Sequence, residues 1–277
     1  RLELAVQSPP VEDLAHVDGL LAGVAEVDLT PPPGMPKSGH SLHARTGVGF
    51  RTRLRVRVLH LRAGSSSIAL VATDLLAGSS IVHHLVAQEV ASDTDVRLPG
   101  LFLGATHTHA GPGQHSGSEF MNRHAANKSG FDPAYTDFLV RRISGAVREA
   151  VAGRVPARLA FGSTEVWGFT RNRSLPAYVA NDNVSDKRTQ TQRKYAAINP
   201  WLHLLRVDDA DGPLGAFLWF SIHGTGISPH DDSYNADVWA YITGTLAAAV
   251  EQESGRRPVV GAVEGTHGDM TPAGRPG

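Results

Sequence analysis

Apolar and polar side chains alternate along several short segments, and this pattern predicts a framework of β-strands. Residues 51–61 (RTRLRVRVLHL) alternate basic and apolar positions, as expected of a strand with one face in water. A Gly-Ser turn leads into residues 67–76, which are apolar almost throughout and predict a more central strand. Residues 201–209 and 213–224 form a second such pair across a short turn. The chain is therefore expected to contain two hairpins.

Helical periodicity marks three segments, at residues 80–91, 133–153 and 236–254. In the second, Phe138, Leu139, Ile143 and Val147 fall on one face, with arginines opposite; further strands are expected at residues 19–28, 101–105, 157–166 and 257–264. The strand, helix and strand of residues 67–105 form a unit with room for a right-handed crossover. We predict an α/β fold with a mixed β-sheet, helices packed on the sheet and an active site at the strand carboxyl ends.

The chain divides into a short arm and one large domain. Residues 1–18 show no clear period and are expected to form a peripheral N-terminal arm, whereas residues 19–277 are expected to form one large domain. The Gly/Pro-rich end directly follows a strand, so this domain is expected to be incomplete at its C-terminus. Residues 114–131 are polar and Gly/Ser/Asn-rich, which predicts a long surface loop at the edge of a cleft.

Composition and charge narrow the classes of function. The 277 residues are 41% hydrophobic and 19% charged, an ordinary globular composition, and the net charge of −1 argues against a nucleic-acid partner. The chain has no cysteine, so disulfides, thiolate metal sites and cysteine nucleophiles are excluded. Any metal must therefore bind His, Asp, Glu or Tyr. No apolar run approaches the roughly 20 residues that span a bilayer.

The strongest candidate chemistry follows the strand at residues 101–105, where His107 and His109 precede a Gly-Pro-Gly turn. Side chains at positions i and i+2 of a strand point to the same side, so the two imidazoles would face one cavity. Each offers a nitrogen that binds Zn²⁺ at about 2.0–2.1 Å. The alternative is that both are solvated loop histidines or hydrogen-bonded core groups. His40 and His43, in the loop at residues 35–50, are candidate cavity groups as well, but for these two we favour solvated loop histidines.

Three strands end in a histidine or an acid followed by glycine, in the segments HTHAGPG (107–113), HGTG (223–226) and EGTHGDMTP (264–272). Asp74 also falls at a strand end. Metal-capable groups at several strand ends favour a shared site over isolated surface histidines, because functional groups gather at the carboxyl ends of strands in α/β sheets.

Five motifs in order together resemble a known family. They are GVAEVDLTPPPG (23–34), HTHAGPG (107–113), NRSLPAY (172–178), WFSIHGTG (219–226) and GDMTP (268–272). The chain is similar to the N-terminal catalytic domain of neutral/alkaline non-lysosomal ceramidases. The resemblance implies a zinc amidase that cleaves the N-acyl bond of ceramide-like lipids into a fatty acid and a sphingoid base.

The resemblance also assigns roles to individual residues. His107 and His223 match the two family histidines that hold zinc, and His109 matches a histidine that faces the substrate, although strand geometry alone would make it a ligand. Arg173 matches the arginine of the family's Asn-Arg-Ser motif, near the reacting oxygen. Thr271 stands where the family has a serine, and we assign it to the catalytic residues; its hydroxyl is retained, but the extra methyl stiffens χ1 and crowds the pocket.

The family completes its zinc site with a Glu and a Tyr from downstream sequence that has no counterpart here. Two histidines alone bind Zn²⁺ weakly, because catalytic sites use three protein ligands and a water. Three alternatives follow. A second chain or a downstream segment supplies the missing ligands, a local acid such as Asp237 or Asp269 takes their place, or the chain holds no metal. For these two acids we favour structural roles at a helix start and a turn.

Two alternative functions remain: a zinc hydrolase of the same fold acting on another amide or ester, and a non-catalytic binding module without a complete metal site. The expected partner is a small lipid amide, with peripheral membrane contact giving access to it. The resemblance further implies a secreted or extracytoplasmic location.

Overall fold

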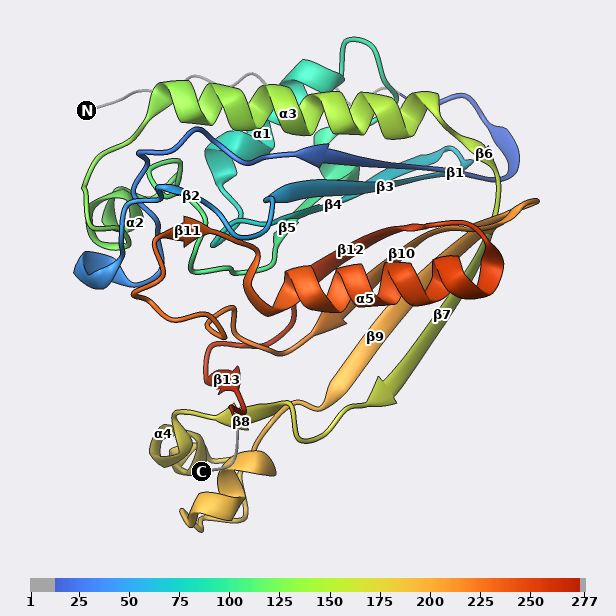
Figure 1. Cartoon of the computed structure of the whole chain (residues 1–277). Coiled ribbons are helices and arrows are strands. Elements are labelled where there is room, and N and C mark those ends of the chain that lie inside the picture. The colour runs from blue at the N-terminus through green and yellow to red at the C-terminus, as the bar shows by residue number, and fades with distance from the viewer. Residues whose placement is uncertain (1–12, 275–277) are drawn as a thin grey trace.

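The computed structural model describes residues 13–274, whose helices and strands stack in four layers (Figure 1). Helices α1 and α3 cover one sheet, a second sheet packs on the other face of the first, and α5 covers the second sheet. The strands are β1 (Val17–Asp28), β2 (Gly49–Phe50), β3 (Arg55–Gly64), β4 (Ser66–Thr73), β5 (Leu101–Ala105), β6 (Val155–Pro156), β7 (Arg158–Glu165), β8 (Thr170–Asn172), β9 (Trp201–Asp209), β10 (Gly212–Phe220), β11 (Ser233–Tyr234), β12 (Val259–Glu264) and β13 (Met270–Pro272). The α-helices are α1 (Ser80–Val90), α2 (Glu119–His124), α3 (Pro133–Ala152), α4 (Leu175–Ala180) and α5 (Asp237–Ser254), and short 3₁₀ turns cover Ser41–His43, Leu98–Gly100 and Thr191–Tyr195.

The two sheets share one topology. Their strand orders are β5-β4-β3-β1-β6 and β12-β10-β9-β7. In the first sheet, the antiparallel pairs β1–β3 and β3–β4 are followed by a crossover helix and the parallel pair β4–β5. In the second sheet, the antiparallel pairs β7–β9 and β9–β10 are followed by a crossover helix and the parallel pair β10–β12. The predicted α/β class is confirmed, and the two predicted hairpins fall in separate sheets. The chain thus contains a topological repeat that sequence patterns did not indicate.

Three hydrophobic clusters fill the three interfaces between the layers. The predicted apolar face of α3, including Leu139 and Ile143, packs on the first sheet. Leu59 and Phe217 belong to the cluster between the sheets, and Trp239 of α5 packs on the second sheet. Complete burial of each large side chain stabilises the fold by about 1.5–3 kcal/mol. These layers hold the carboxyl ends of both parallel pairs in fixed positions.

The prediction that the strand at residues 51–61 has a wet face was wrong. Arg57 and Arg62 of β3 are buried, because carboxylates from other elements neutralise them. Arg57 Nε donates to Glu26 at 2.7 Å, and Arg62 Nε donates to Asp95 at 3.1 Å. Alternating charge therefore marks buried ion pairs here, and β3 is covered on both sides.

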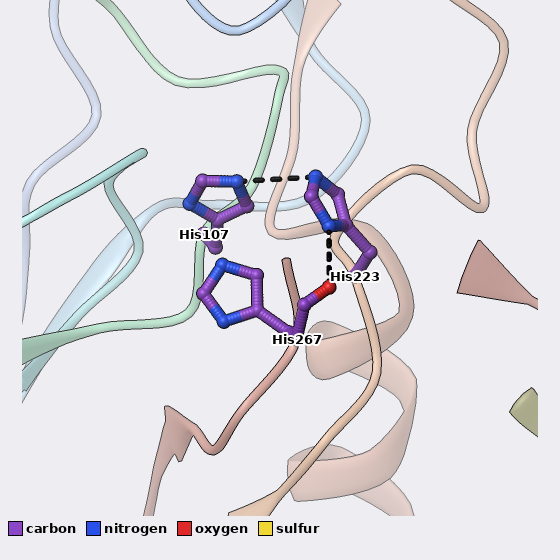
Figure 2. A group of neighbouring side chains, drawn as sticks. All are labelled: His107, His223 and His267. Carbon is purple, nitrogen blue, oxygen red and sulfur yellow. Dashed lines mark hydrogen bonds between the residues drawn. The ribbon is translucent and has the colours of Figure 1, made fainter. Parts of the chain in front are cut away.

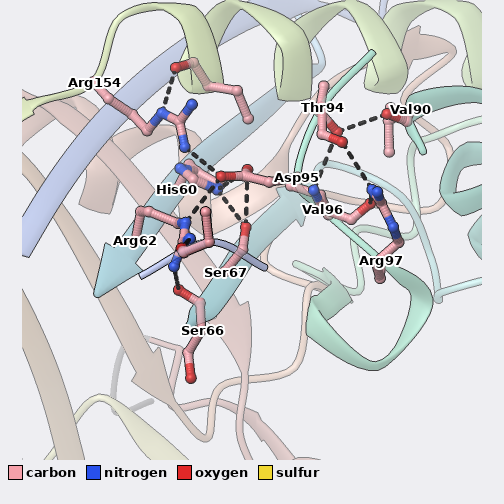
Figure 3. A network of polar contacts seen from close by, with 12 residues as sticks. His60, Arg62, Ser66, Ser67, Val90, Thr94, Asp95, Val96, Arg97 and Arg154 are labelled. Atoms are coloured by element: carbon pink, nitrogen blue, oxygen red, sulfur yellow. Dashed lines mark hydrogen bonds and ion pairs between the residues drawn. The ribbon is translucent and has the colours of Figure 1, made fainter. Parts of the chain in front are cut away.

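Asp95 is the centre of a polar network at the far end of the first sheet (Figure 3). Arg154 donates to its carboxylate at 2.6 Å, and the buried ring of His60 lies 3.4 Å from it. Burial alone would raise the pKa of Asp95, but hydrogen bonds from His60 and Arg154 hold it well below its usual value. The network joins β3, the segment after α1 and the segment after α3.

Several loop predictions need correction. The polar segment 114–131 contains helix α2, whose N-cap Ser118 accepts a hydrogen bond from the Met121 amide. Residues 169–180, where no helix or strand was predicted, contain β8 and α4. The predicted arm lies mostly outside the described residues, and β1 begins at Val17, two residues before the predicted boundary. The division into arm and domain stays a prediction. Within residues 13–274, no helix has both the length and the apolar character needed to span a membrane.

Candidate metal centre

The candidate site lies where the carboxyl ends of the two parallel pairs meet. The loop after β5 carries His107 and His109, the loop after β10 carries His223, and the loop after β12 carries His267. Crossover helices set the strand directions, so all three strands point their carboxyl ends at the same edge of the stacked sheets (Figure 1). The site therefore takes residues from both sheets.

His107 and His109 reach one cavity for a reason that differs from the predicted strand alternation. β5 ends at Ala105, and His107 has a left-handed backbone with φ 53°. Such a conformation costs of order 1–3 kcal/mol in a non-glycine residue and persists where surrounding contacts fix it. The Thr108 hydroxyl donates to Asn235 O at 2.7 Å, and the His109 amide donates to Gly224 O at 3.1 Å.

Three imidazoles converge in this cavity (Figure 2). His107 Nε2 lies 3.1 Å from His223 Nε2, and one ligand nitrogen from each of His107, His223 and His267 lies within 4.8 Å of the others. His109 Nε2 also lies 3.0 Å from His223 Nε2. Its ring centroid is 4.7 Å from that of His40, so the first loop reaches the same cluster. Positions 107 and 223 thus lie side by side in the structure, and their assignment as metal ligands stays a prediction.

Backbone carbonyls determine which nitrogen of each ring carries the proton. His107 Nδ1 lies 2.6 Å from Leu76 O, and His223 Nδ1 lies 3.1 Å from His267 O. A carbonyl only accepts, so both Nδ1 atoms must donate and both neutral rings present an unprotonated Nε2. Two facing lone pairs 3.1 Å apart repel each other unless a cation lies between them. The donor set therefore fits a metal ion such as Zn²⁺.

Burial lowers the pKa of all three rings that sequence motifs singled out. The pKa of His107 falls to about 3, through burial and then through the neighbouring His267 and His223. Burial, with His107 and His40 nearby, lowers the pKa of His109 to about 2, and burial lowers that of His223 to about 4 despite its hydrogen bond to His267 O. Each imidazole is neutral at pH 7, which is the form that binds metal.

A pocket of about 300 Å³ opens beside the histidines. Arg173 borders it, and its Nε and Nη2 donate to Gly268 O at 3.2 and 2.9 Å. Phe120 of α2 also borders it and is 69% exposed. Thr271 lies on β13 opposite Arg171 and does not border this pocket. The catalytic role predicted for Thr271 stays a prediction.

The acids considered in the sequence have structural contacts. Asp74 is fully buried and accepts a hydrogen bond from Arg57 at 3.2 Å, so it does not join the histidines. Asp237 accepts from the amides of Gly226, Ile227 and Val238, which ties the loop after β10 to the start of α5. Asp269 accepts from the Asn172 side chain at 2.8 Å. The structural roles predicted for Asp237 and Asp269 agree with these contacts.

Sequence analysis did not assign His267 to the site. Its signal was present, because a Gly-Thr-His-Gly segment directly follows the β12 strand as a histidine pair follows β5. The strand-end pattern grouped this segment with the other two, but it did not single out His267 as a ligand. The ring centroid of His267 lies 4.2 Å from that of His107.

Comparison with known proteins decides the family. A family model described as neutral/alkaline non-lysosomal ceramidase, N-terminal, matches residues 20–275. The chain belongs to this ceramidase family. The motifs that suggested the resemblance are spread across the matched range, so the resemblance is confirmed over nearly the whole chain.

Among ceramidase relatives, neutral ceramidase of Pseudomonas aeruginosa is 29% identical over 234 residues, covering 78% of this chain and 33% of the relative. Neutral ceramidase of Mycobacterium tuberculosis is 28% identical over 245 residues, covering 84% and 37%. The crystal structure of the Pseudomonas aeruginosa enzyme matches with a TM-score of 0.81 and 25% identity, covering 92% of this chain and 40% of that one. A structure of a ceramidase complexed with C2 matches with a TM-score of 0.79 and 26% identity. The chain thus spans about a third of the length of the curated relatives.

Proposed function

We propose that the protein is a zinc-dependent amide hydrolase that cleaves the N-acyl bond of ceramide-like lipids. The observation that carries the proposal is the pair of unprotonated Nε2 atoms of His107 and His223, 3.1 Å apart beside a pocket that Arg173 borders. Membership of the ceramidase family supports the choice of substrate. The relatives named neutral ceramidase and the ceramidase complexed with C2 support it further.

His107 and His223 would hold the metal. When bound, Zn²⁺ supplies Lewis-acid polarisation of a carbonyl and lowers the pKa of a water to roughly 7. In the overall reaction the oxygen of water bonds to the amide carbon, the C–N bond breaks and the amine nitrogen gains a proton. The products are a fatty acid and a sphingoid base.

Arg173 and His109 would act on the substrate. The Arg173 guanidinium is held by Gly268 O and carries a permanent positive charge, so it can stabilise the oxyanion that forms at the carbonyl. His109 also borders the pocket and is buried. Its neutral ring carries an N–H on one nitrogen and a lone pair on the other, so it can donate a proton towards the leaving amine while its other nitrogen takes one up. Removing one oxyanion donor typically slows turnover by ~10²–10³-fold.

The pocket entrance suits a lipid. Phe120 is 69% exposed at the pocket, and Leu42 is 80% exposed next to Ser41, which borders the same pocket. Large apolar side chains exposed beside a binding pocket favour contact with an acyl chain or a membrane surface. Peripheral membrane contact and an extracytoplasmic location remain part of this proposal.

The decisive test compares two variants in a ceramide hydrolysis assay. His107→Ala should lose zinc and activity together, whereas Arg173→Ala should keep zinc and lose about 10²–10³-fold in kcat/KM. Arg171→Ala is the matched control, because Arg171 lies two residues away and does not border the pocket. Full activity of His107→Ala after removal of all metal would refute the proposal, as would equal losses in the two arginine variants.

A second candidate is hydrolysis of a smaller amide or ester by the same machinery. The observation that favours it is the pocket volume of about 300 Å³, at the lower end of the range of about 300–1,000 Å³ for ligand sites. A panel of ceramides and short N-acyl amines separates the two candidates. A higher kcat/KM for the short N-acyl amines than for the ceramides would favour the second candidate. Zinc binding without turnover of any substrate would instead favour a binding module.

A further inference from the structure

We propose that His267 is the third metal ligand, so that residues of this chain alone complete a three-histidine site. The inference rests on the proposed function only in taking Zn²⁺ as the metal. The family resemblance assigns no role to this position, and the two completions considered from sequence were acids or another polypeptide segment. The evidence is the place of His267 in the fold, the hydrogen bonds of its ring and its distance from the other two histidines.

The first evidence comes from the topological repeat of the two sheets. β12 holds the same place in the second sheet as β5 holds in the first, because each is the parallel strand that follows the crossover helix. His107 lies two residues after the end of β5, and His267 lies three residues after the end of β12. The two sheets therefore deliver a histidine from equivalent strand ends, and the ring centroids lie 4.2 Å apart.

The second evidence is the orientation of the ring. His267 Nδ1 lies 3.0 Å from Gly265 O, so Nδ1 donates and Nε2 is left without a proton, as in His107 and His223. A carboxyl oxygen of Glu264 lies 3.6 Å from the same Nδ1. Metal-binding histidines in proteins generally donate their second ring nitrogen to a carbonyl or a carboxylate, which fixes the ring and raises its basicity.

His109 is the competing candidate, and its surroundings differ. Its Nδ1 is buried without a hydrogen-bond partner in the described part of the chain, so no carbonyl fixes its tautomer. His109 can therefore carry its proton on either ring nitrogen, and its Nε2 lies 3.0 Å from His223 Nε2. This arrangement suits a group that handles protons next to the metal better than a ligand.

The third evidence is proximity. One nitrogen from each of His107, His223 and His267 lies within 4.8 Å of the others, and a side-chain adjustment of about an ångström would reach the spacing that N–Zn bonds of about 2.0–2.1 Å require. The loop that carries His267 is held on its other side, where Gly268 O accepts hydrogen bonds from Arg173. Three histidines and one open position form a standard catalytic zinc site.

The test measures metal binding without substrate. Zinc affinity is determined by competition with a chromophoric chelator, and Co²⁺ loading reports coordination through its visible absorption bands. His267→Ala should weaken zinc binding by about 100-fold or more, because even outer-shell partners of zinc ligands cost about 10–100-fold. It should also shift the Co²⁺ bands. His109→Ala is the matched control and should change zinc affinity by less than about threefold, which is smaller than the loss of about 10–100-fold caused by removing an outer-shell partner.

Two further variants separate a ligand from a merely structural residue. His267→Asp restores a metal-binding atom and should recover much of the zinc affinity, whereas His267→Gln has a similar size but should not. Urea unfolding of each metal-free variant identifies any loss that comes from misfolding.

Unchanged zinc affinity in His267→Ala overturns the inference, and so does an equal loss in His109→Ala. The proposed function fails separately. A protein that binds zinc through all three histidines and hydrolyses no ceramide would refute the function and leave the ligand assignment in place. Ceramide hydrolysis by the unmodified protein, together with normal zinc affinity in His267→Ala, would refute the ligand assignment and leave the proposed function in place.

Discussion

Replacing Gly224 by alanine tests how the metal centre is built, because this residue packs directly on the backbone of the opposing loop. A Cβ at position 224 would lie 2.3 Å from His107 O and 2.9 Å from Thr108 Cα. Ordinary contacts begin near 3.4 Å, so the two loops must separate by about 1.1 Å (3.4 minus 2.3). The obstructing atoms belong to the backbone and cannot rotate away. The methyl group therefore pushes the His107 and His223 loops apart.

The size of the effect follows from this overlap. Overpacking of a buried site typically costs about 1–3 kcal/mol, and the strained backbone at His107 leaves little freedom to absorb it. We expect Gly224→Ala to lower the free energy of unfolding of the metal-free protein by that amount. Zinc affinity should fall about tenfold for each 1.4 kcal/mol of strain that the metal-bound form carries.

Urea denaturation measures the stability, and chelator competition measures the zinc affinity. Gly145→Ala is the matched control, because Gly145 is exposed in helix α3 and a Cβ there meets nothing within 4 Å. This control should stabilise the protein by about 0.4–1 kcal/mol and leave zinc affinity unchanged. If Gly224→Ala unfolds and binds zinc like the unmodified protein, Gly224 does not pack against the backbone of His107 and Thr108.

Two further predictions concern stability. Asp95→Asn should destabilise the protein by about 2–4 kcal/mol at pH 7, because it leaves the guanidinium groups of Arg62 and Arg154 without their carboxylate. The pKa of Asp95 is lowered in the folded state, so its contribution is complete above about pH 5 and is lost as the pH falls through about 4 and below. Urea denaturation between pH 3 and 7 should show the difference between the two proteins closing in acid; a constant difference would contradict this account. Tyr135→Phe should change stability by less than about 1 kcal/mol or stabilise, because the buried Tyr135 hydroxyl has no partner within residues 13–274. Tyr234→Phe should cost about 1–3 kcal/mol in thermal or urea unfolding, because its hydroxyl accepts from the Met35 amide at 2.9 Å; equal effects in the two variants would refute the distinction.

Local signals in the sequence were enough to predict the framework. Helical periodicity gave helix α3 within one residue of its observed end, and the apolar run at residues 101–105 matched β5. These features depend on neighbours a few positions away. The family motifs also predicted that His107 and His223 would meet.

Features that depend on distant partners were not predicted. The basic residues of β3 were interpreted as solvent-facing, since nothing near Arg57 in the sequence indicates that Glu26 will neutralise it. The division of the strands into two sheets, and with it the place of His267, depends on pairings between segments far apart in the chain. The left-handed backbone at His107 likewise follows from contacts with the loop after β10.

The origin of the histidines in two stacked sheets has a mechanical consequence. His107 belongs to the first sheet, whereas His223 and His267 belong to the second, so an ion held by all three would clamp the layers together. By mass action, free zinc at 100 times its dissociation constant would add about 2.7 kcal/mol to the free energy of unfolding. Separation of the layers would release the ion, so the zinc-bound protein should resist separation of its two sheets more than the metal-free protein does.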